Sequence, residues 1–369
     1  MQSGWLRQFF HQHDAQCGHG VEAEGAAAEG KATDDVSRRD FVKTGVAAGV
    51  AAGMAAGAVV AQTSSAQAQP VNPMGRNWWP SRWGPNDEKG AYNRQTPAKA
   101  MEAARLIKTG RIYPLSQALE TGIPLFGARH ISLTIPGGPT GGPFGTHALY
   151  FNDEMFSGEI GQVGSQFDGL GHIAVKVGND IRYYNGFTQE QVGGAYGLQK
   201  LGIQNLGPIF TRGIMLDIAT LKGVDRLAIN YIVTMADVTQ ALSRQGIREP
   251  GEGDVVLFHT GHSKLWKTHN HEYNKGCPGP SNTVANWLAS KGVMVVGADT
   301  WPVEAVPGED KARPFECHVI WITMNGIHIN ENLNLDGLVK DRVYEFAYSF
   351  NPLRLTGATG SPGNSVALA

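Results

Sequence analysis

The sequence predicts an α/β fold in which short buried strands alternate with helices around one hydrophobic core. Hydrophobic residues make up 41% and charged residues 17% of the 369-residue chain, a balance typical of a globular protein. The 48 glycines and 19 prolines imply many tight turns, which suits a sheet-rich fold better than a helical bundle. No Pro/Ser-rich linker or charge run follows Pro70, so residues 69–369 are expected to form a single domain.

The first 68 residues differ in kind from the rest and predict export. The sequence SRRDFVK at 37–43 is a twin-arginine signature, and an uncharged stretch rich in Ala and Gly follows at 44–60. Residues 66–68, AQA, offer a cleavage site. A membrane anchor is the alternative, but the stretch falls short of the ~20 strongly apolar residues that a span needs. We therefore expect residues 1–68 to be cleaved, with no stable membrane anchor, after the Tat machinery delivers the protein to the periplasm or outside the cell.

The elements of the remaining chain follow from capping residues and apolar patterns. Thr96 can cap a helix whose first position is Pro97 and whose apolar spacing runs to Ile107, before Gly110. Apolar runs between Gly/Pro turns predict strands, and further capped segments predict helices. Strands are expected at 112–115, 130–135, 147–152, 213–218, 254–260, 293–297 and 319–329, and helices at 236–245 and 281–291.

Residues 162–172, QVGSQFDGLGH, concentrate side chains that can bind metal or transfer protons. In an extended chain, Gln162, Gln166 and Asp168 share one face, and His172 follows four residues later. Carboxylate oxygen suits Mn, Mg or Zn, and an imidazole can accept a proton near neutral pH. The two glutamines can instead hydrogen-bond across a sheet or hold substrate, so a metal-free site stays open as an alternative.

This segment resembles the HxGTHxDxPxH signature of the cyclase family, the group of kynurenine formamidases and isatin hydrolases. The resemblance extends to RGIMLD at 212–217, to 253–261 and to ENLNL at 331–335. It implies a single domain with the swivelling β/β/α fold. It also implies His172 and Asp168 as catalytic residues, and metal ligands at Gln162, Gln166, Asp168, His318 and Glu331, where the family has histidines in place of both glutamines.

The resemblance further implies a hydrolase that acts on C–N bonds other than peptide bonds, in an amide, N-formyl group or small cyclic amide. Its expected cofactor is a divalent ion, Mn or Zn, its partner a small-molecule substrate, and its assembly a homo-oligomer, dimer or tetramer. Lactone hydrolase, cyclase or lyase, and a non-catalytic periplasmic binding protein without metal are the alternatives. The net charge of −2 gives no reason to expect a nucleic-acid partner.

Several other side chains carry open interpretations. His259 and His262 flank a Thr-Gly pair at the end of a predicted strand, where substrate contact and a structural role are equally plausible. Asp299 and Glu304 follow another predicted strand and could form a turn. The spacing of Cys277 and Cys317 does not tell whether they pair.

Overall fold

The computed structural model describes residues 72–369, which belong to one compact unit spanning Ala66–Ala369. The predicted twin-arginine signature and cleavage site lie outside the described residues. Among residues 72–369, no helix has both the length and the hydropathy that crossing a bilayer requires.

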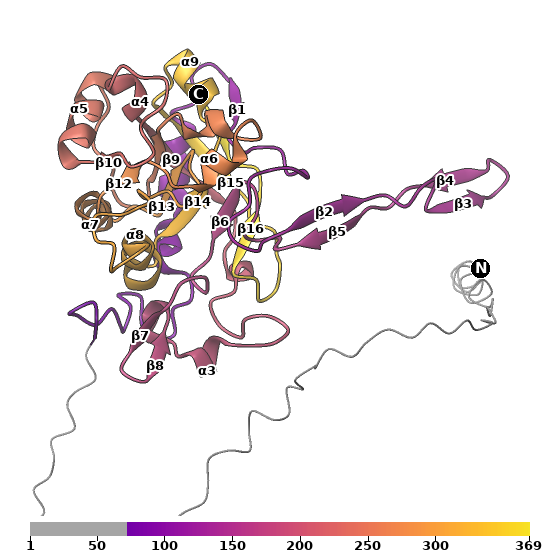
Figure 1. Cartoon of the computed structure of the whole chain (residues 1–369), viewed down its shortest axis with the longest axis horizontal. Coiled ribbons are helices and arrows are strands. Elements are labelled where there is room, and N and C mark those ends of the chain that lie inside the picture. The colour runs from indigo at the N-terminus through magenta and orange to yellow at the C-terminus, as the bar shows by residue number, and fades with distance from the viewer. Residues whose placement is uncertain (1–71) are drawn as a thin grey trace, which may run out of the picture. The chain divides into compact units, whose positions relative to one another are not determined.

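A nine-stranded mixed sheet forms the centre of this unit (Figure 1). Its four middle strands, β9, β11, β13 and β14, run parallel, and the remaining strands join them in antiparallel fashion. The predicted α/β class is therefore confirmed. In sheet order the strands are β1 (Ile112–Pro114), β17 (Val366–Leu368), β15 (Glu345–Phe350), β9 (Ile209–Asp217), β11 (Val255–His259), β13 (Val295–Ala298), β14 (His328–Glu331), β6 (Gln166–Asp168) and β16 (Gly360–Pro362).

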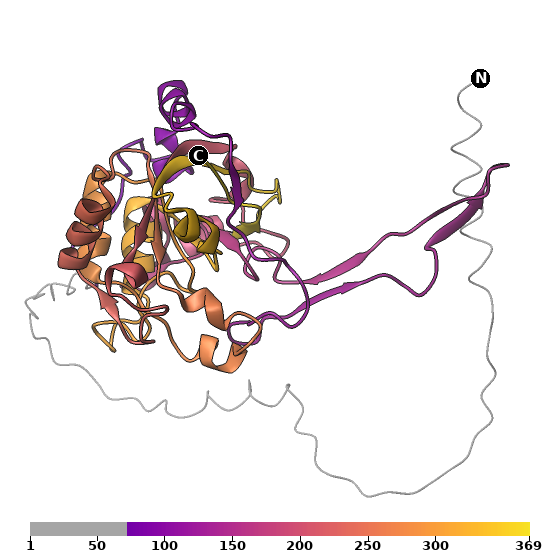
Figure 2. The same ribbon diagram turned by 90° about the horizontal axis from the view of Figure 1, so that it is seen from above.

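Helices cover the sheet, and α4, α5 and α7 gather on one side of it (Figures 1 and 2). The helix expected from residue 96 is confirmed as α2, where the Thr96 side chain accepts a hydrogen bond from the backbone N–H of Lys99. The α-helices are α2 (Pro97–Ala104), α3 (Gln189–Val192), α4 (Ile218–Leu221), α5 (Met235–Gln245), α6 (Asn270–Asn274), α7 (Asn282–Lys291), α8 (Glu316–His318) and α9 (Asp336–Asp341).

The other two expected helices are confirmed together with their ends. Thr234 caps α5 in a capping box with Asp237, and Ser281 caps α7 through the backbone N–H of Val284. Both helices end at a glycine with left-handed backbone, a conformation that costs other residues more.

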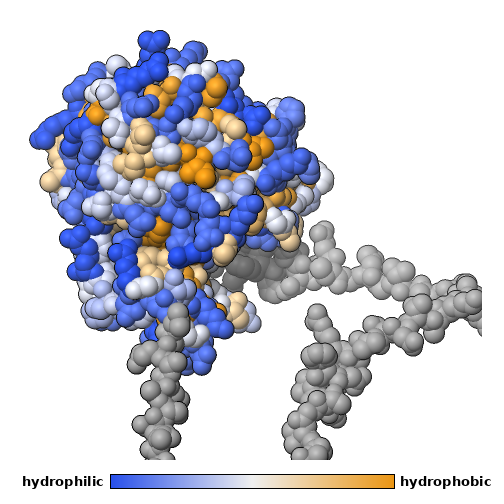
Figure 3. Space-filling model, turned by 60° about the vertical axis from the view of Figure 1, so that its left-hand side comes forward, coloured by the Kyte–Doolittle hydropathy of each residue, from blue (hydrophilic) through white to orange (hydrophobic). Residues whose placement is uncertain are grey.

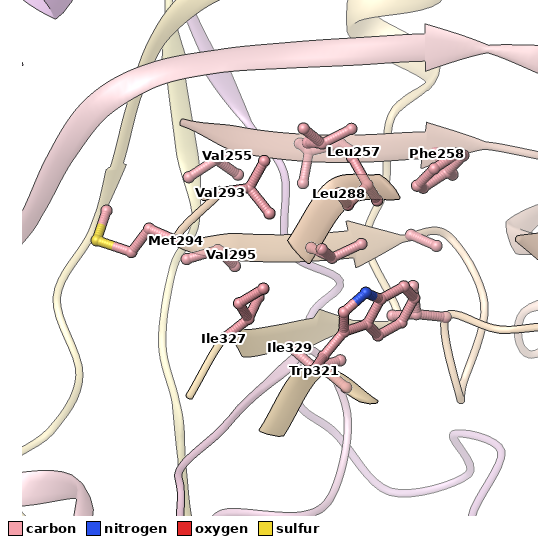
Figure 4. Close-up of a cluster of buried hydrophobic side chains, with 14 of the residues drawn as sticks. Val255, Leu257, Phe258, Leu288, Val293, Met294, Val295, Trp321, Ile327 and Ile329 are labelled. Carbon is pink, nitrogen blue, oxygen red and sulfur yellow. The ribbon is translucent and has the colours of Figure 1, made fainter. Parts of the chain in front are cut away.

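The main core lies between these helices and the parallel strands. Figure 4 shows Val255 and Leu257 of β11, Val295 of β13 and Leu288 of α7 packed together, with Trp321 beside them. All five side chains are fully buried. Burial on this scale contributes about 25 cal/mol per Å² of apolar surface, which makes it the dominant stabilising term.

The strand expected at 319–329 is wrong except for its last two residues. Val319–Met324 forms a π-helix, η6, and only His328–Glu331 is a strand. A continuous buried apolar run has the same appearance in a core helix as in a core strand, so its pattern could not distinguish them.

The motif at 162–172 also departs from one extended segment. Only Gln166–Asp168 is a strand, and Gln162 precedes it in a bend where Gly164 has a φ of 66°. The expected alternation of faces therefore does not hold before Gln166.

A long two-stranded arm leaves the rest of the described unit (Figures 1 and 2). Its strands are β2 (Ile131–Thr134) with β5 (Met155–Gly158), and β3 (Gly141–Phe144) with β4 (Leu149–Phe151). Five large apolar side chains on it are exposed: Leu133, Ile135, Leu149, Tyr150 and Met155. The face of the unit in Figure 3, by contrast, is largely hydrophilic with hydrophobic side chains in smaller groups.

Two further strand pairs complete the described unit. They are β7 (Val175–Val177) with β8 (Asp180–Arg182), and β10 (Ile232–Val233) with β12 (Gly279–Pro280). The four 3-10 segments are η2 (Gly90–Arg94), η3 (Tyr184–Gly186), η4 (Ile203–Asn205) and η5 (His262–Leu265).

Candidate metal centre

Strand β6 carries the central part of the motif into the sheet, between β14 and β16. Gln166 lies opposite Glu331 of β14, and Asp168 follows two residues later on the same face. Strand β14 is also the last of the four parallel strands, so Glu331 stands at the carboxyl edge of the sheet, where open α/β sheets bind ligands.

Three of the five predicted metal ligands meet at this edge. The potential ligand atoms of Asp168, His318 and Glu331 lie within 4.8 Å of one another, and all three residues are buried. His318 Nε2 is 3.2 Å from Glu331 Oε1 and 3.9 Å from Asp168 Oδ2. This group could hold a divalent ion.

Glu304 holds the imidazole of His318 in place. Its Oε1 lies 2.6 Å from His318 Nδ1 and accepts the backbone N–H of His318, so Nε2 is left to face the carboxylates. Burial alone would lower the pKa of His318, but the hydrogen bonds with Glu304 and Glu331 raise this pKa to about 10. Burial and the Asp168 carboxylate raise the pKa of Glu331 to about 7. Because a ligand imidazole must be neutral, a cation would compete with the proton on His318.

Two buried oxygen atoms in this cluster lack a hydrogen-bond partner within residues 72–369. They are Asp168 Oδ2 and Gln166 Oε1. Buried polar atoms without a partner are rare, and a cation between them would satisfy both. Two carboxylates, one imidazole and one amide oxygen suit Mn or Zn. The residues present therefore fit a divalent ion.

The two glutamines occupy different positions in this cluster. Gln166 Nε2 donates to Glu331 Oε2 at 2.7 Å and leaves its Oε1 available. Gln162 Nε2 donates to Asp168 Oδ1 at 3.2 Å, and its Oε1 accepts from Arg129 and Gln166, both at 3.3 Å. Gln166 thus has an oxygen free to bind an ion, whereas hydrogen bonds already use both amide atoms of Gln162.

His172 lies beside the cluster in the turn that follows β6. Its Nε2 is 4.0 Å from Asp168 Oδ2, and its side chain is 20% exposed. Burial lowers the pKa of His172, and the nearby Asp168 carboxylate only partly offsets this effect. A neutral, partly accessible imidazole at this position can accept a proton from a molecule bound next to the cluster.

An apolar cavity of about 240 Å³ opens over these polar groups. Phe126 stacks on Trp301 with ring centroids 4.7 Å apart, and Phe315 approaches Phe126 edge to face at 6.2 Å. These rings form a wall next to a floor that includes His172 and Glu331. Such a cavity fits a small flat molecule whose polar bond lies against the floor.

Arg129 lines the same cavity, although no sequence pattern predicts a role for it. Its guanidinium donates to the backbone oxygen of Gln162 at 2.9 Å and lies 5.6 Å from the ring of Phe126. No motif surrounds this arginine. It lies in the site only because the chain, after leaving Arg129 to form the arm, comes back beside it at Gln162.

The two histidines at the carboxyl end of β11, His259 and His262, lie away from this cavity. His259 Nδ1 contacts Asp217 Oδ1 at 2.7 Å, and His262 Nε2 contacts the backbone oxygen of Tyr273 at 3.1 Å. Neither histidine lines the cavity over the metal centre. Asp299 accepts the backbone N–H groups of Thr260 and the next residue, so it ties β13 to β11.

Both cysteines of the described region are free thiols buried in the protein. Burial raises the pKa of Cys277 and of Cys317 well above the ordinary value. These two side chains form no disulfide and act as small core residues.

Residues 113–305, more than half of the chain, match the sequence model of the Cyclase family, described as "Putative cyclase". The chain belongs to this cyclase family. The structure of a protein described as a novel cyclase is 29% identical to it, with a TM-score of 0.68, and the match covers 78% of this chain and 96% of that one. The nine-stranded sheet around the candidate metal centre is thus the fold of this family.

Isatin hydrolases share this cyclase fold at lower identity. Isatin hydrolase A from Ralstonia solanacearum is 20% identical, with a TM-score of 0.50 and coverage of 74% of this chain and 97% of that one. An isatin hydrolase bound to the product analogue thioisatinate is 16% identical, with a TM-score of 0.53 and coverage of 74% and 99%. No curated protein sequence matches the chain.

Proposed function

We propose that this cyclase-family protein is a metal-dependent hydrolase of small amides, with an N-formyl or cyclic amide C–N bond as its target. The unpartnered Oδ2 of Asp168, 3.9 Å from His318 Nε2 and 4.0 Å from His172 Nε2, carries the proposal. A carboxylate oxygen without a hydrogen-bond partner, which could bind an ion, therefore lies beside His172, which could act as a base. The isatin hydrolases with the same fold support the choice of a cyclic amide.

A divalent ion, when bound, supplies Lewis-acid polarisation of a carbonyl and lowers the pKa of a nearby water. Asp168, His318 and Glu331 would hold it. His172 Nε2 takes the proton from the attacking water and returns it to the leaving nitrogen, since its lowered pKa keeps it neutral at the start. The aromatic wall orients the flat substrate. The Arg129 guanidinium can bind the carboxylate that hydrolysis of the amide forms.

Elemental analysis of purified protein and a substrate screen test this proposal. The panel contains N-formyl aromatics, cyclic imides, lactams and lactones, so ester opening is distinguished from amide opening. We expect about one divalent ion per chain, loss of hydrolysis after chelation, and recovery with Mn or Zn. Full amide hydrolysis by protein verified as metal-free would overturn the mechanism.

One observation favours a second candidate function, ligand binding without catalysis. The amide groups of Gln166 and Gln162 donate hydrogen bonds to the carboxylates of Glu331 and Asp168, respectively. These two carboxylates are therefore partly stabilised without an ion. A binding protein would retain panel compounds unchanged and contain no bound ion. The same two measurements therefore separate the candidates.

We also propose export through the Tat pathway, on the basis of the SRRDFVK signature, and assembly into a homo-oligomer. The exposed apolar side chains of the β2–β5 arm support assembly because a two-stranded ribbon is marginal by itself. Intact-mass analysis of exported protein tests cleavage after residue 68. Light scattering tests the oligomeric state.

A further inference from the structure

A second cavity, of about 320 Å³, lies at the carboxyl end of β9. Its walls come from three places in the chain: the end of β9 with α4, the last turns of α5, and the segment after α9. It shares no lining residue with the cavity over the metal centre. Its volume falls near the lower end of the ~300–1,000 Å³ typical of small-molecule sites.

Asp217 provides a buried negative charge in the wall of this cavity. The residue is only 4% exposed. Its Oδ1 accepts the backbone N–H of Thr220 and contacts His259, whereas its Oδ2 has no partner within residues 72–369. Burial by itself would raise the pKa of Asp217, but the hydrogen bond with His259 prevails and lowers it, which keeps the carboxylate charged. The same hydrogen bond outweighs burial and raises the pKa of His259, so the imidazolium pairs with Oδ1 and leaves Oδ2 without a donor. A buried carboxylate oxygen without a donor calls for one from a ligand.

Two arginines provide the opposite charge on the same walls. Arg244, in the last turn of α5, and Arg342, directly after α9, both line the cavity and are exposed. Across residues 72–369 neither guanidinium has a hydrogen-bond or ion-pair partner, in contrast to Arg212, which pairs with Asp254 and Glu345. Free guanidinium groups beside a cavity are suited to a carboxylate, which they can bind through paired hydrogen bonds.

We infer that this cavity binds a small α-amino acid, with the ammonium on Asp217 Oδ2 and the carboxylate on Arg244 and Arg342. A simple anion would meet the Asp217 carboxylate, and a simple amine would meet two guanidinium groups, so each is disfavoured by like charge. A zwitterion can pair its ammonium with Asp217 and its carboxylate with the two arginines. Leu221 and Ala241 supply an apolar wall for an aliphatic side chain. The site is independent of the proposed hydrolysis.

Titration calorimetry on the purified full chain, with leucine, 4-methylpentanoate and isopentylamine, tests this inference. The last two compounds lack the ammonium and the carboxylate of leucine, respectively. Leucine should bind at least tenfold more tightly than either. The double variant Arg244→Ala/Arg342→Ala should weaken leucine binding by tenfold or more, while Arg105→Ala, which removes an exposed arginine elsewhere, should leave it unchanged.

Asp217→Asn gives a second readout, because it removes the charge and keeps an oxygen that can accept the backbone N–H of Thr220. It should weaken leucine binding without weakening the binding of 4-methylpentanoate, because only the ammonium depends on Asp217. Circular dichroism of each variant shows that the fold is kept. The inference is overturned if alanine, leucine and glutamate all bind more weakly than about 10 mM, or if leucine binding survives the double arginine substitution.

Discussion

His172 differs from the buried histidines of the described region in what surrounds its ring. His318, His259 and His262 each contact a carboxylate or a backbone oxygen at 3.2 Å or less. The ring of His172 has no hydrogen-bond partner within residues 72–369 and keeps 20% of its side chain exposed beside the cavity. It is therefore free to exchange a proton with a bound molecule.

Replacing His172 with Ala should lower kcat for the best substrate of the screen by about 100- to 10,000-fold, the usual worth of a positioned base. His172→Gln should not restore the rate, since an amide cannot carry the proton. Metal content, measured alongside, should stay at the parent level. Turnover within a few-fold of the parent, with the ion still bound, would return His172 to a structural role.

Glu304 acts on the metal centre through His318 and should not touch the substrate. Glu304→Gln keeps an acceptor for the backbone but loses the charge that orients the imidazole, so we expect Mn or Zn affinity to fall about 10- to 100-fold. Competition with a chromogenic chelator measures this affinity without any substrate. Glu316→Gln is the matched control, because Glu316 lies on α8 with His318 but pairs with Arg313. Equal affinities in both variants would contradict the assignment.

Helix α7 shows how local sequence signals support the sheet. Its cap, its terminal glycine and its buried Val284, Ala285 and Leu288 agree on one helix that packs beside β13. Ser281 also continues the backbone pairing near β12, since its N–H donates to Val233. The helix thereby links the core to the edge of the small β10–β12 pair.

Ser281→Ala should lower the free energy of unfolding by about 1 kcal/mol, because the backbone N–H of Val284 loses its capping acceptor. Urea unfolding followed by circular dichroism measures the change. Ser290→Ala near the other end of the helix, where the hydroxyl is exposed, serves as the control and should cost less. Equal losses in the two variants would mean that the cap contributes nothing specific.

The sequence predicted elements well where a cap or an alternation marked them, as at α2, α5 and α7. It failed at Val319–Met324, where a buried apolar run has no distinguishing period. In the site, residue spacing and family resemblance pointed to Asp168, His318 and Glu331, which the fold brings together. Arg129 and the aromatic wall were not predictable because each comes from a different loop, and only tertiary packing places them together.

At the scale of the whole molecule, the arm presents large apolar side chains that are exposed to solvent. Its strands pair as β2 with β5 and as β3 with β4, and exposed apolar residues lie on both pairs. Within 131–158 only Asp153 and Glu154 carry formal charge, so this segment lacks the basic residues that bind nucleic acid or anionic lipids. A second copy of the chain is the partner that the proposed homo-oligomer supplies.

Changing Leu133 and Met155 together to Ser should therefore shift the protein toward a smaller assembly, because an apolar interface loses its buried surface. Light scattering over a tenfold dilution series measures the mass. Leu353→Ser, an exposed apolar residue outside the arm, is the control. A monomeric parent protein, or an unchanged mass in the double variant, would contradict a role for the arm in assembly.

The placement of β6 between β14 and β16 has a consequence for biosynthesis. Asp168 pairs with Ile329 on one side and with Gly360 on the other, so the strand that bears it gains both neighbours only when nearly the whole chain has left the ribosome. A nascent chain cannot bring the ion-binding residues together before Glu331 of β14 exists, and it cannot flank β6 on both sides before β16 exists. Products truncated before Gly360 would lack β16, the strand that pairs with one edge of β6. That exposed strand edge would make them targets for proteolysis before they could bind an ion.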